Sequence, residues 1–146
     1  NEFMIRIYEA TEPSDLLAEA FARLLPQLSE RMTAPDREAV ARIVASPATR
    51  QLVAAAEDGR IVGLLSVALY DVPSGRKAWI EDVVVDAATR GRGIGEALVR
   101  EALALARREG VARVMLTSNA TRRAAHRLYE RMGFVRYETD CFRLDL

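Results

Sequence analysis

The sequence is poor in residues that stabilise small proteins through covalent or metal bonds. It contains one cysteine, Cys141, and one histidine, His126. A single cysteine excludes a disulfide within the chain, and this pair cannot supply the full ligand set of a structural zinc site. We therefore expect no metal. The unpaired thiol is typical of a reducing compartment, so the expected location is cytoplasmic.

Two further absences limit the partners. Acidic and basic residues number 21 each, so no excess of positive charge favours nucleic acid. Lys77 is the only lysine, and the arginines form local clusters such as Arg122, Arg123, Arg127 and Arg131. No run of about 18 apolar residues occurs, and no charged-then-apolar leader is visible. We expect neither a nucleic-acid partner nor a membrane association.

The remaining composition is that of one globular domain. Half of the 146 residues are hydrophobic, which is enough to form a buried core without covalent cross-links. We expect a single domain over residues 4–146. Residues 1–3 precede a natural-looking start at Met4 and are interpreted as a remnant of cloning.

Hydrophobic periodicity predicts an α/β chain of mixed α+β type, with about seven strands and about four helices. Helices are expected to begin at Thr11–Pro13 and at Thr33–Asp36, and to cover Gly93–Arg108 and Ala120–Met132. Strands are expected over Met4–Tyr8, Gln51–Ala56, Ile61–Tyr70, Lys77–Val85, Val111–Leu116, Phe134–Tyr137 and Cys141–Leu146. The helical crossover before Val111 predicts one parallel pair in a mostly antiparallel sheet.

A glycine- and arginine-rich loop follows the strand Lys77–Val85. Its residues are Arg90, Gly91, Arg92, Gly93, Ile94 and Gly95. Alternate glycines let successive backbone N–H groups point at one anion, and a helix N-terminus adds positive charge. A pyrophosphate fits such a loop, although a simple chain reversal is the alternative. Walker A and dinucleotide-binding motifs both fail at Glu96.

This loop resembles the acyl-CoA signature of the Gcn5-related N-acetyltransferase (GNAT) superfamily, Gln/Arg-x-x-Gly-x-Gly/Ala. It reads here as Arg90-x-x-Gly93-x-Gly95. A second family hallmark is present as Asn119 before a helix, followed by Leu-Tyr-Glu-Arg-Met-Gly-Phe at 128–134. The resemblance covers nearly the whole chain. It implies the GNAT fold, in which a central parallel strand pair is splayed to admit acetyl-CoA.

The resemblance also implies residue roles, with acetyl-CoA as the cofactor. The backbone of three valines would pair with the pantetheine arm: Val83, Val84 and Val85. The pyrophosphate would be held by the loop residues Arg90, Gly91, Arg92, Gly93, Ile94 and Gly95. Asn119 would hydrogen-bond the pantetheine arm. Tyr129 would lie near the thioester sulfur and protonate the departing thiolate, the alternative being a packed aromatic with a satisfied hydroxyl.

Glu81 and Asp82 are the candidates for the general base. Adjacent side chains on a strand leave opposite faces unless a bulge re-aims one of them. Because burying such a pair is costly, it favours a function, with a salt bridge or helix cap as the alternative. We expect Glu81 to deprotonate the amine, directly or through water, and rank Asp82 second. The lone His126 is expected to face solvent.

The predicted function is direct, acetyl-CoA-dependent acetylation of a primary amine on a small molecule. Ile80-Glu81-Asp82 is similar to glucosamine-6-phosphate N-acetyltransferases, but their acidic Asp-x-Asp after the next strand is absent from 116–119. One alternative is a protein lysine or N-terminal acetyltransferase. Another is a non-catalytic CoA-binding regulatory module. The expected strand Cys141–Leu146 could pair between chains, so a homodimer is possible.

Overall fold

The computed structural model describes residues 4–146, so the interpretation of residues 1–3 lies outside the described part. The elements are β1 (Ile5–Glu9), α1 (Asp15–Leu28), α2 (Arg37–Ala45), β2 (Thr49–Ala56), β3 (Ile61–Val72), β4 (Gly75–Val85), the 3-10 turn η1 (Ala87–Thr89), α3 (Ile94–Arg108), β5 (Val114–Met115) and α4 (Arg123–Arg131). The five strands form one sheet in the order β1-β2-β3-β4-β5. All neighbours are antiparallel except β4 and β5, which are parallel. The predicted fold class is therefore confirmed.

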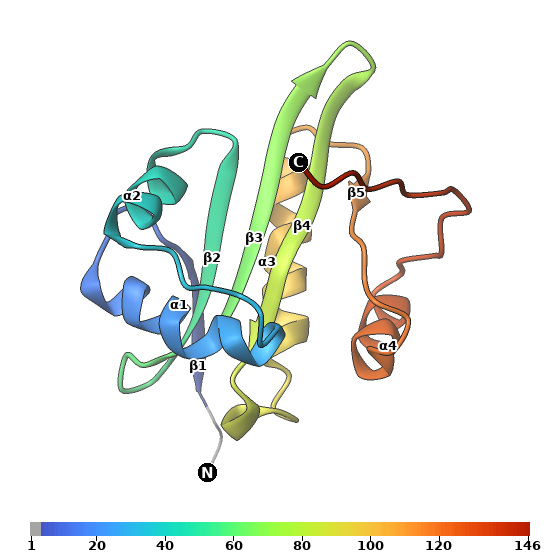
Figure 1. Cartoon of the computed structure of the whole chain (residues 1–146). Coiled ribbons are helices and arrows are strands. Elements are labelled where there is room, and N and C mark those ends of the chain that lie inside the picture. Colours follow the sequence, from blue (N-terminus) through green and yellow to red (C-terminus); the bar gives the residue numbers. More distant parts are fainter. Residues whose placement is uncertain (1–3) are drawn as a thin grey trace.

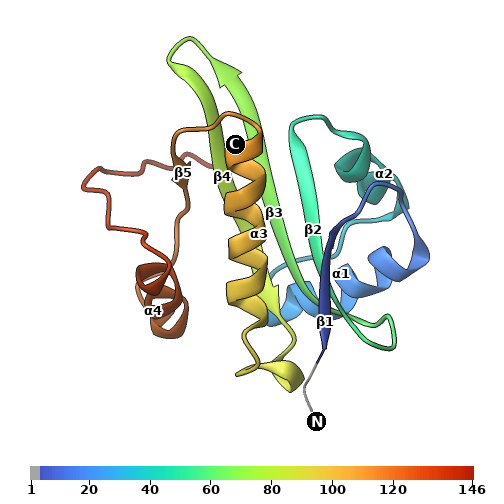
Figure 2. The same cartoon turned by 180° about the vertical axis from the view of Figure 1, so that it is seen from behind.

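Helices cover both faces of the sheet. α1 and α2 lie on one face and α3 on the other (Figures 1 and 2). The α1 face is filled by Leu17, Phe21 and Leu24 against Val53 and Leu64, whereas α3 packs its own apolar stripe on the opposite face. α4 lies beyond β5 and adds partly buried residues to the α3 core (Figure 1). Within the described residues, no helix is long and apolar enough to cross a bilayer.

Short polar residues define where the helices begin and end. The Ser14 hydroxyl accepts a hydrogen bond from the Leu17 N–H at 3.1 Å and caps α1. The Asp36 carboxylate caps α2 in the same way. After α3, Gly110 adopts a φ of 76°, and the Val111 N–H reaches back to the Ala106 carbonyl. These caps explain why the predicted helix positions hold to within a few residues.

A buried carboxylate joins α1 to the end of β4. Asp86 is 6 % exposed, and its Oδ2 lies 3.2 Å from Nη1 of Arg23 on α1. Its Oδ1 accepts hydrogen bonds from the Ala88 N–H and from Gln27 Nε2. Burial raises the pKa of Asp86, but these hydrogen bonds and the nearby arginine charges outweigh burial and leave it lowered. The network anchors the start of the glycine-rich loop.

The expected strands Phe134–Tyr137 and Cys141–Leu146 are wrong. Residues 135–146 pair with no strand within the described chain, and most of their large apolar side chains are exposed. The expected strand Val111–Leu116 shortens to β5, which has two residues. Alternating apolar residues show that a segment has two different sides, but a strand also requires a partner edge. Nothing in the local pattern supplies that edge.

Candidate active site

A β-bulge in β4 shapes the site. Leu64 of β3 lies opposite Val84, and Ser66 lies opposite Glu81, so two residues of β4 face one of β3. The extra residue is Asp82, whose φ is +50°, a left-handed conformation that Asp tolerates better than most side chains. The bulge also reverses which residues face α3. These are Ala78 and Ile80 before it, and Val83 and Val85 after it.

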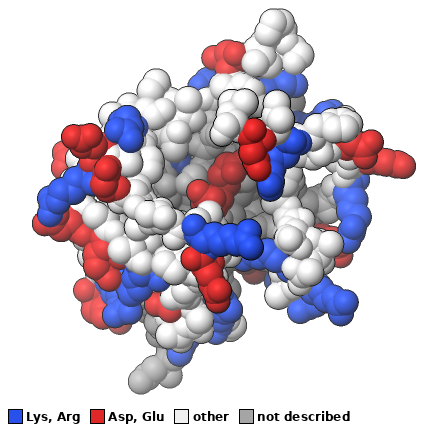
Figure 3. All heavy atoms as spheres, viewed as in Figure 1, with Lys and Arg blue, Asp and Glu red and all other residues white. Residues whose placement is uncertain are grey.

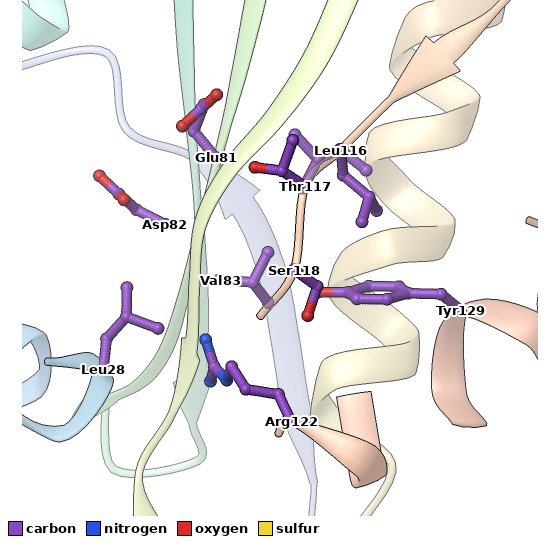
Figure 4. Close-up of a pocket in the computed structure, with 10 residues that line it drawn as sticks. Leu28, Glu81, Asp82, Val83, Leu116, Thr117, Ser118, Arg122 and Tyr129 are labelled. Carbon is purple, nitrogen blue, oxygen red and sulfur yellow. The ribbon is translucent and has the colours of Figure 1, made fainter. Parts of the chain in front are cut away.

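The bulge brings the two carboxylates to the same pocket, which two adjacent side chains of a regular strand would not reach together. Glu81 and Asp82 both project from β4 toward the α1 side (Figure 4). Both keep solvent-accessible surface, so the cost of burying them is only partial, and the structure shows it at Glu81. Figure 3 shows a hollow in the centre of this face with acidic atoms inside it. The carboxylates thus place negative charge where an ammonium group can reach it.

The pocket encloses about 180 Å³ between α1, β4 and the segment that follows β5. Tyr129 points into it from α4, on the other side of β4 from the carboxylates (Figure 4). The lining residues are Leu28, Ile80, Glu81, Asp82, Val83, Leu116, Thr117, Ser118, Arg122 and Tyr129. β4 and β5 pair only at Ala78–Val114 and Trp79–Met115, so the pocket lies where the two strands stop pairing.

The surroundings of Glu81 and Tyr129, the candidate base and acid, shift the pKa of each group. Desolvation raises the pKa of the Glu81 carboxyl, and the charge of Asp82 raises it further. Burial also raises the pKa of the Tyr129 hydroxyl, opposed in part by the charge of Arg122. A carboxylate with a raised pKa is a stronger base, and a tyrosine with a raised pKa stays protonated at neutral pH. The shift suits Glu81 as a base, whereas it makes Tyr129 a weaker acid and gives no support to the acid role; both roles stay predictions.

The predicted loop faces open space beside the start of α3. Gly91 and Gly93 have φ values of 79° and 76°, and a Cβ on either would meet no atom within 4 Å. Gly93 is the N-cap of α3 and leaves its first N–H groups without a side-chain cap. Gly95 serves packing, because a Cβ there would lie 3.3 Å from Leu128 and 3.7 Å from Val85.

Two predicted positions differ from expectation in their surroundings. The Asn119 side chain accepts hydrogen bonds from the Thr121 N–H and hydroxyl, and Asn119 is not among the pocket-lining residues. Its contact with a pantetheine arm stays a prediction. His126 was expected to face solvent, which is wrong. The residue is half-buried, and its Nε2 is buried with no hydrogen-bond partner. His126 lies three residues before the half-buried Tyr129, so the two side chains share one side of α4.

Sequence reasoning assigned four of the ten lining residues to the site and missed the other six, which are Leu28, Ile80, Leu116, Thr117, Ser118 and Arg122. Leu28 reaches it from the C-terminal end of α1, and Arg122 from just before α4 (Figure 4). The sequence places Arg122 in a cluster with Arg123, Arg127 and Arg131, and no local pattern separates it from them. The bulge did leave a signal: Ala78 and Ile80 are spaced by two, as are Val83 and Val85, but the two pairs are out of phase.

The sequence matches the model of a known protein family over most of its length. The model of the acetyltransferase (GNAT) family matches residues 6–134. The chain belongs to the GNAT acetyltransferase family. This confirms the family predicted from the loop and from residues 128–134, and it covers every element of the described fold.

Relatives of this GNAT chain include named acetyltransferases. A probable glucosamine 6-phosphate N-acetyltransferase of Oryza sativa subsp. japonica is 36% identical over 141 residues, covering 90% of this chain and 81% of its own. Mycothiol acetyltransferase of Thermomonospora curvata is 36% identical over 89 residues, covering 61% of this chain. The chain spans less than a third of the length of such mycothiol enzymes, with 29% of this one covered. The crystal structure of a Trypanosoma brucei acetyltransferase superposes with a TM-score of 0.79 and 30% identity, covering 98% of this chain and 100% of that one.

Proposed function

We propose that the chain is an acetyl-CoA-dependent N-acetyltransferase that acts directly on a primary amine of a small molecule. The observation that carries this proposal is the convergence of Glu81, Asp82 and Tyr129 on one pocket. That pocket lies where the parallel strands β4 and β5 stop pairing. A relative named as a probable glucosamine 6-phosphate N-acetyltransferase supports the same activity.

The residues around the pocket fit acetyl-CoA. Beyond Trp79 the edge of β4 that faced β5 has no strand partner, so the backbone of Val83 and Val85 is available to an extended arm. The open loop at Gly91 and Gly93 and the uncapped N–H groups of α3 suit a pyrophosphate. Arg90 adds a positive side chain at the entrance to this loop.

In this mechanism the side chains move two protons. Acetyl-CoA would supply the acetyl group as a thioester. The Glu81 carboxylate would take a proton from the acceptor's ammonium group, directly or through water, and so free the nitrogen lone pair. Asp82 would hold the ammonium group electrostatically before that transfer. The Tyr129 hydroxyl would donate its proton to the departing thiolate sulfur. No side chain is needed as a nucleophile.

The size and charge of the pocket point to the acceptor's chemistry. A cavity of about 180 Å³ is smaller than a typical ligand pocket, so it takes only the amine end of the acceptor. The choice of a small molecule over a protein rests on the relatives named above. Arg122 balances part of the negative charge and would pair with an anionic group. We propose a cytoplasmic location, which the exposed free thiol of Cys141 supports, and a homodimer, which the open outer edge of β5 supports.

The test uses paired isosteric variants and a panel of amines, peptides and proteins. Glu81→Gln should lower kcat/KM by roughly 10²- to 10⁴-fold and remove the acidic limb of its pH profile, with acetyl-CoA affinity retained. In the wild type the raised pKa of Glu81 moves that limb to higher pH, because the base must be deprotonated. Asp82→Asn is the matched control and should keep the limb.

Release of the CoA thiol provides the readout. Because Cys141 is an exposed thiol that reacts with thiol reagents, the assay should use a Cys141→Ser background. Full activity of the Glu81→Gln variant would contradict the proposed base. Acetyl-CoA binding without acetylation anywhere in the panel would instead support a non-catalytic module.

A further inference from the structure

We propose that Gln51 and Ser66 position the group from which Glu81 takes a proton. Gln51 of β2 lies opposite Ser66 of β3, and Ser66 lies opposite Glu81 of β4, in the last regular pair before the bulge. Residues opposite one another on adjacent strands share a face of the sheet, so the three side chains form one polar row. Leu65 and Ile80 belong to the core under α3, so the row faces the α1 side. This inference rests on the proposed role of Glu81 as the base.

Buried contacts fix the orientation of the Gln51 side-chain amide. Gln51 is 3% exposed, and its Nε2 lies 3.2 Å from the carbonyl oxygen of Leu52 and 3.3 Å from that of Leu65. A carbonyl oxygen only accepts hydrogen bonds, so the NH₂ end of the amide must be the end that faces these two carbonyls. Both amide hydrogens are thereby used, and the amide oxygen faces Ser66.

The amide oxygen in turn fixes the hydroxyl group of Ser66. Ser66 Oγ lies 2.7 Å from Gln51 Oε1, which can only accept a hydrogen bond. The single hydroxyl hydrogen of Ser66 therefore points at Gln51 and away from Glu81. The lone pairs of Ser66 Oγ remain available as acceptors. Ser66 is half-buried, so water or a ligand can reach this oxygen.

Two acceptors thus lie side by side, the Ser66 oxygen and the Glu81 carboxylate. The Cβ atoms of directly opposite residues are about 4.5–5.5 Å apart, and none of residues 4–146 donates a hydrogen bond to Glu81. A group that bridges the two acceptors needs two hydrogens, as the acceptor's ammonium group or a water molecule has. One hydrogen bonds to Ser66 and holds the group in place. The other leaves as a proton to Glu81, and its bonding electron pair stays on the nitrogen or oxygen. A bridging water would regain its proton from the ammonium group.

The same arrangement keeps Glu81 basic. Desolvation raises the pKa of the Glu81 carboxyl, and the charge of the neighbouring Asp82 raises it further. A Ser66 hydroxyl that donated to the carboxylate would stabilise the charged form and lower that pKa. By holding the hydroxyl hydrogen, Gln51 prevents this. The other charged and titratable groups at the pocket, Arg122 and Tyr129, come from α4 and the residue before it.

A carbon-13 NMR titration of the Glu81 carboxyl group tests the orientation of Ser66 without any catalysis, with Glu81→Gln identifying the resonance. Gln51→Met removes the acceptor, so the Ser66 hydroxyl can turn toward Glu81, and the pKa of Glu81 should fall. In a Ser66→Ala background the same Gln51→Met change should leave that pKa unaltered, because the hydroxyl is absent. An equal shift in both backgrounds, or a shift in neither, would overturn the orientation. Thermal unfolding establishes that each variant is folded.

Steady-state kinetics test the positioning role and need only substitutions of half-buried or exposed serines. Ser66→Ala should lower kcat/KM by about 10-fold, the loss expected for one hydrogen bond, and Ser66→Thr should restore most of it because it keeps the hydroxyl. Ser74→Ala is the control, since Ser74 lies exposed in the turn between β3 and β4, and it should match the wild type. A raised KM for the amine would place the ammonium group on Ser66, whereas a lower kcat alone would place a water molecule there.

The failure of this inference and that of the proposed function give different results. Wild-type kcat/KM in Ser66→Ala would overturn the positioning role, whereas the loss of the acidic limb in Glu81→Gln would still support the proposed base. A wild-type protein that acetylates no amine would contradict the proposed function. The NMR titration would then still decide whether Gln51 turns the Ser66 hydroxyl away from Glu81.

Discussion

Placing a charge at Gly93 tests most directly whether the loop holds a pyrophosphate. Gly93 caps α3 with a φ of 76° and a ψ of 15°, and a Cβ there would meet no atom within 4 Å. Asn and Asp tolerate this conformation better than other side chains and are favourable N-caps. Gly93→Asp and Gly93→Asn therefore carry similar backbone strain and fill the same space. They differ by one negative charge.

The expected size of the effect follows from Coulomb's law. Two unit charges about 4 Å apart repel by about 1 kcal/mol in water and by about 4 kcal/mol at an effective dielectric constant near 20. The loop is exposed, so its repulsion lies between these values. The dissociation constant of acetyl-CoA should then be about 5-fold to about 1000-fold higher for Gly93→Asp than for Gly93→Asn. Added salt should reduce the difference between the dissociation constants of the two variants, because it screens the repulsion.

Isothermal titration calorimetry with acetyl-CoA provides the measurement at low and high salt. Dephospho-CoA serves as a second ligand, because it keeps the pyrophosphate but lacks the 3′-phosphate. The Asp-to-Asn difference should persist with it. Equal affinities for the two variants, close to that of the wild type, would refute the assignment of this loop to the pyrophosphate. Thermal unfolding of both variants establishes that the comparison is between folded proteins.

Two further predictions concern the acid and the buried carboxylate. Tyr129→Phe keeps the edge-to-face contact with Phe134, with ring centroids 5.8 Å apart, but should lower kcat by roughly 10²-fold when chemistry limits the rate. Unchanged turnover in pre-steady-state kinetics would remove the acid role. Asp86→Asn should lower the free energy of unfolding by about 1–3 kcal/mol at neutral pH in urea titrations. Because the folded-state pKa of Asp86 is lowered, its stabilisation is present above the ordinary aspartate pKa and is lost as pH falls through the folded-state value, so the two proteins should converge in acid. Equal stability at neutral pH would contradict this.

Local signals in the sequence predicted most of the fold. Apolar periodicity placed α1 and α3 to within a few residues, and the helical crossover between β4 and β5 predicted that those strands are parallel. Prediction failed where an element depended on a distant partner. The segment 135–146 alternates like a strand, yet no edge in the single chain receives it. β5 is shorter than predicted because it pairs with β4 at only two positions, Ala78–Val114 and Trp79–Met115.

Within the site, the loop was predictable from local sequence, whereas the position of the carboxylate pair depended on contacts between distant segments. Glycines at 91, 93 and 95 and the helix that follows are local features, so the sequence by itself indicated an anion-binding loop. Adjacent residues on a regular strand point apart, so the joint position of Glu81 and Asp82 depended on a bulge. The bulge is a shift in the register between β3 and β4. The register depends on how two strands pair, which the sequence of one strand does not determine.

The sequence by itself determined the chemistry that is available: two adjacent carboxylates, a glycine- and arginine-rich loop before a helix, and a tyrosine on a later helix. Tertiary structure alone decided that Glu81, Asp82 and Tyr129 share one pocket, and that Leu28 and Arg122 enter it. The physical reason is the distance along the sequence over which each interaction acts. Backbone conformation and helix capping act over a few residues, whereas the pocket forms where β4 and β5, linked through α3, stop pairing.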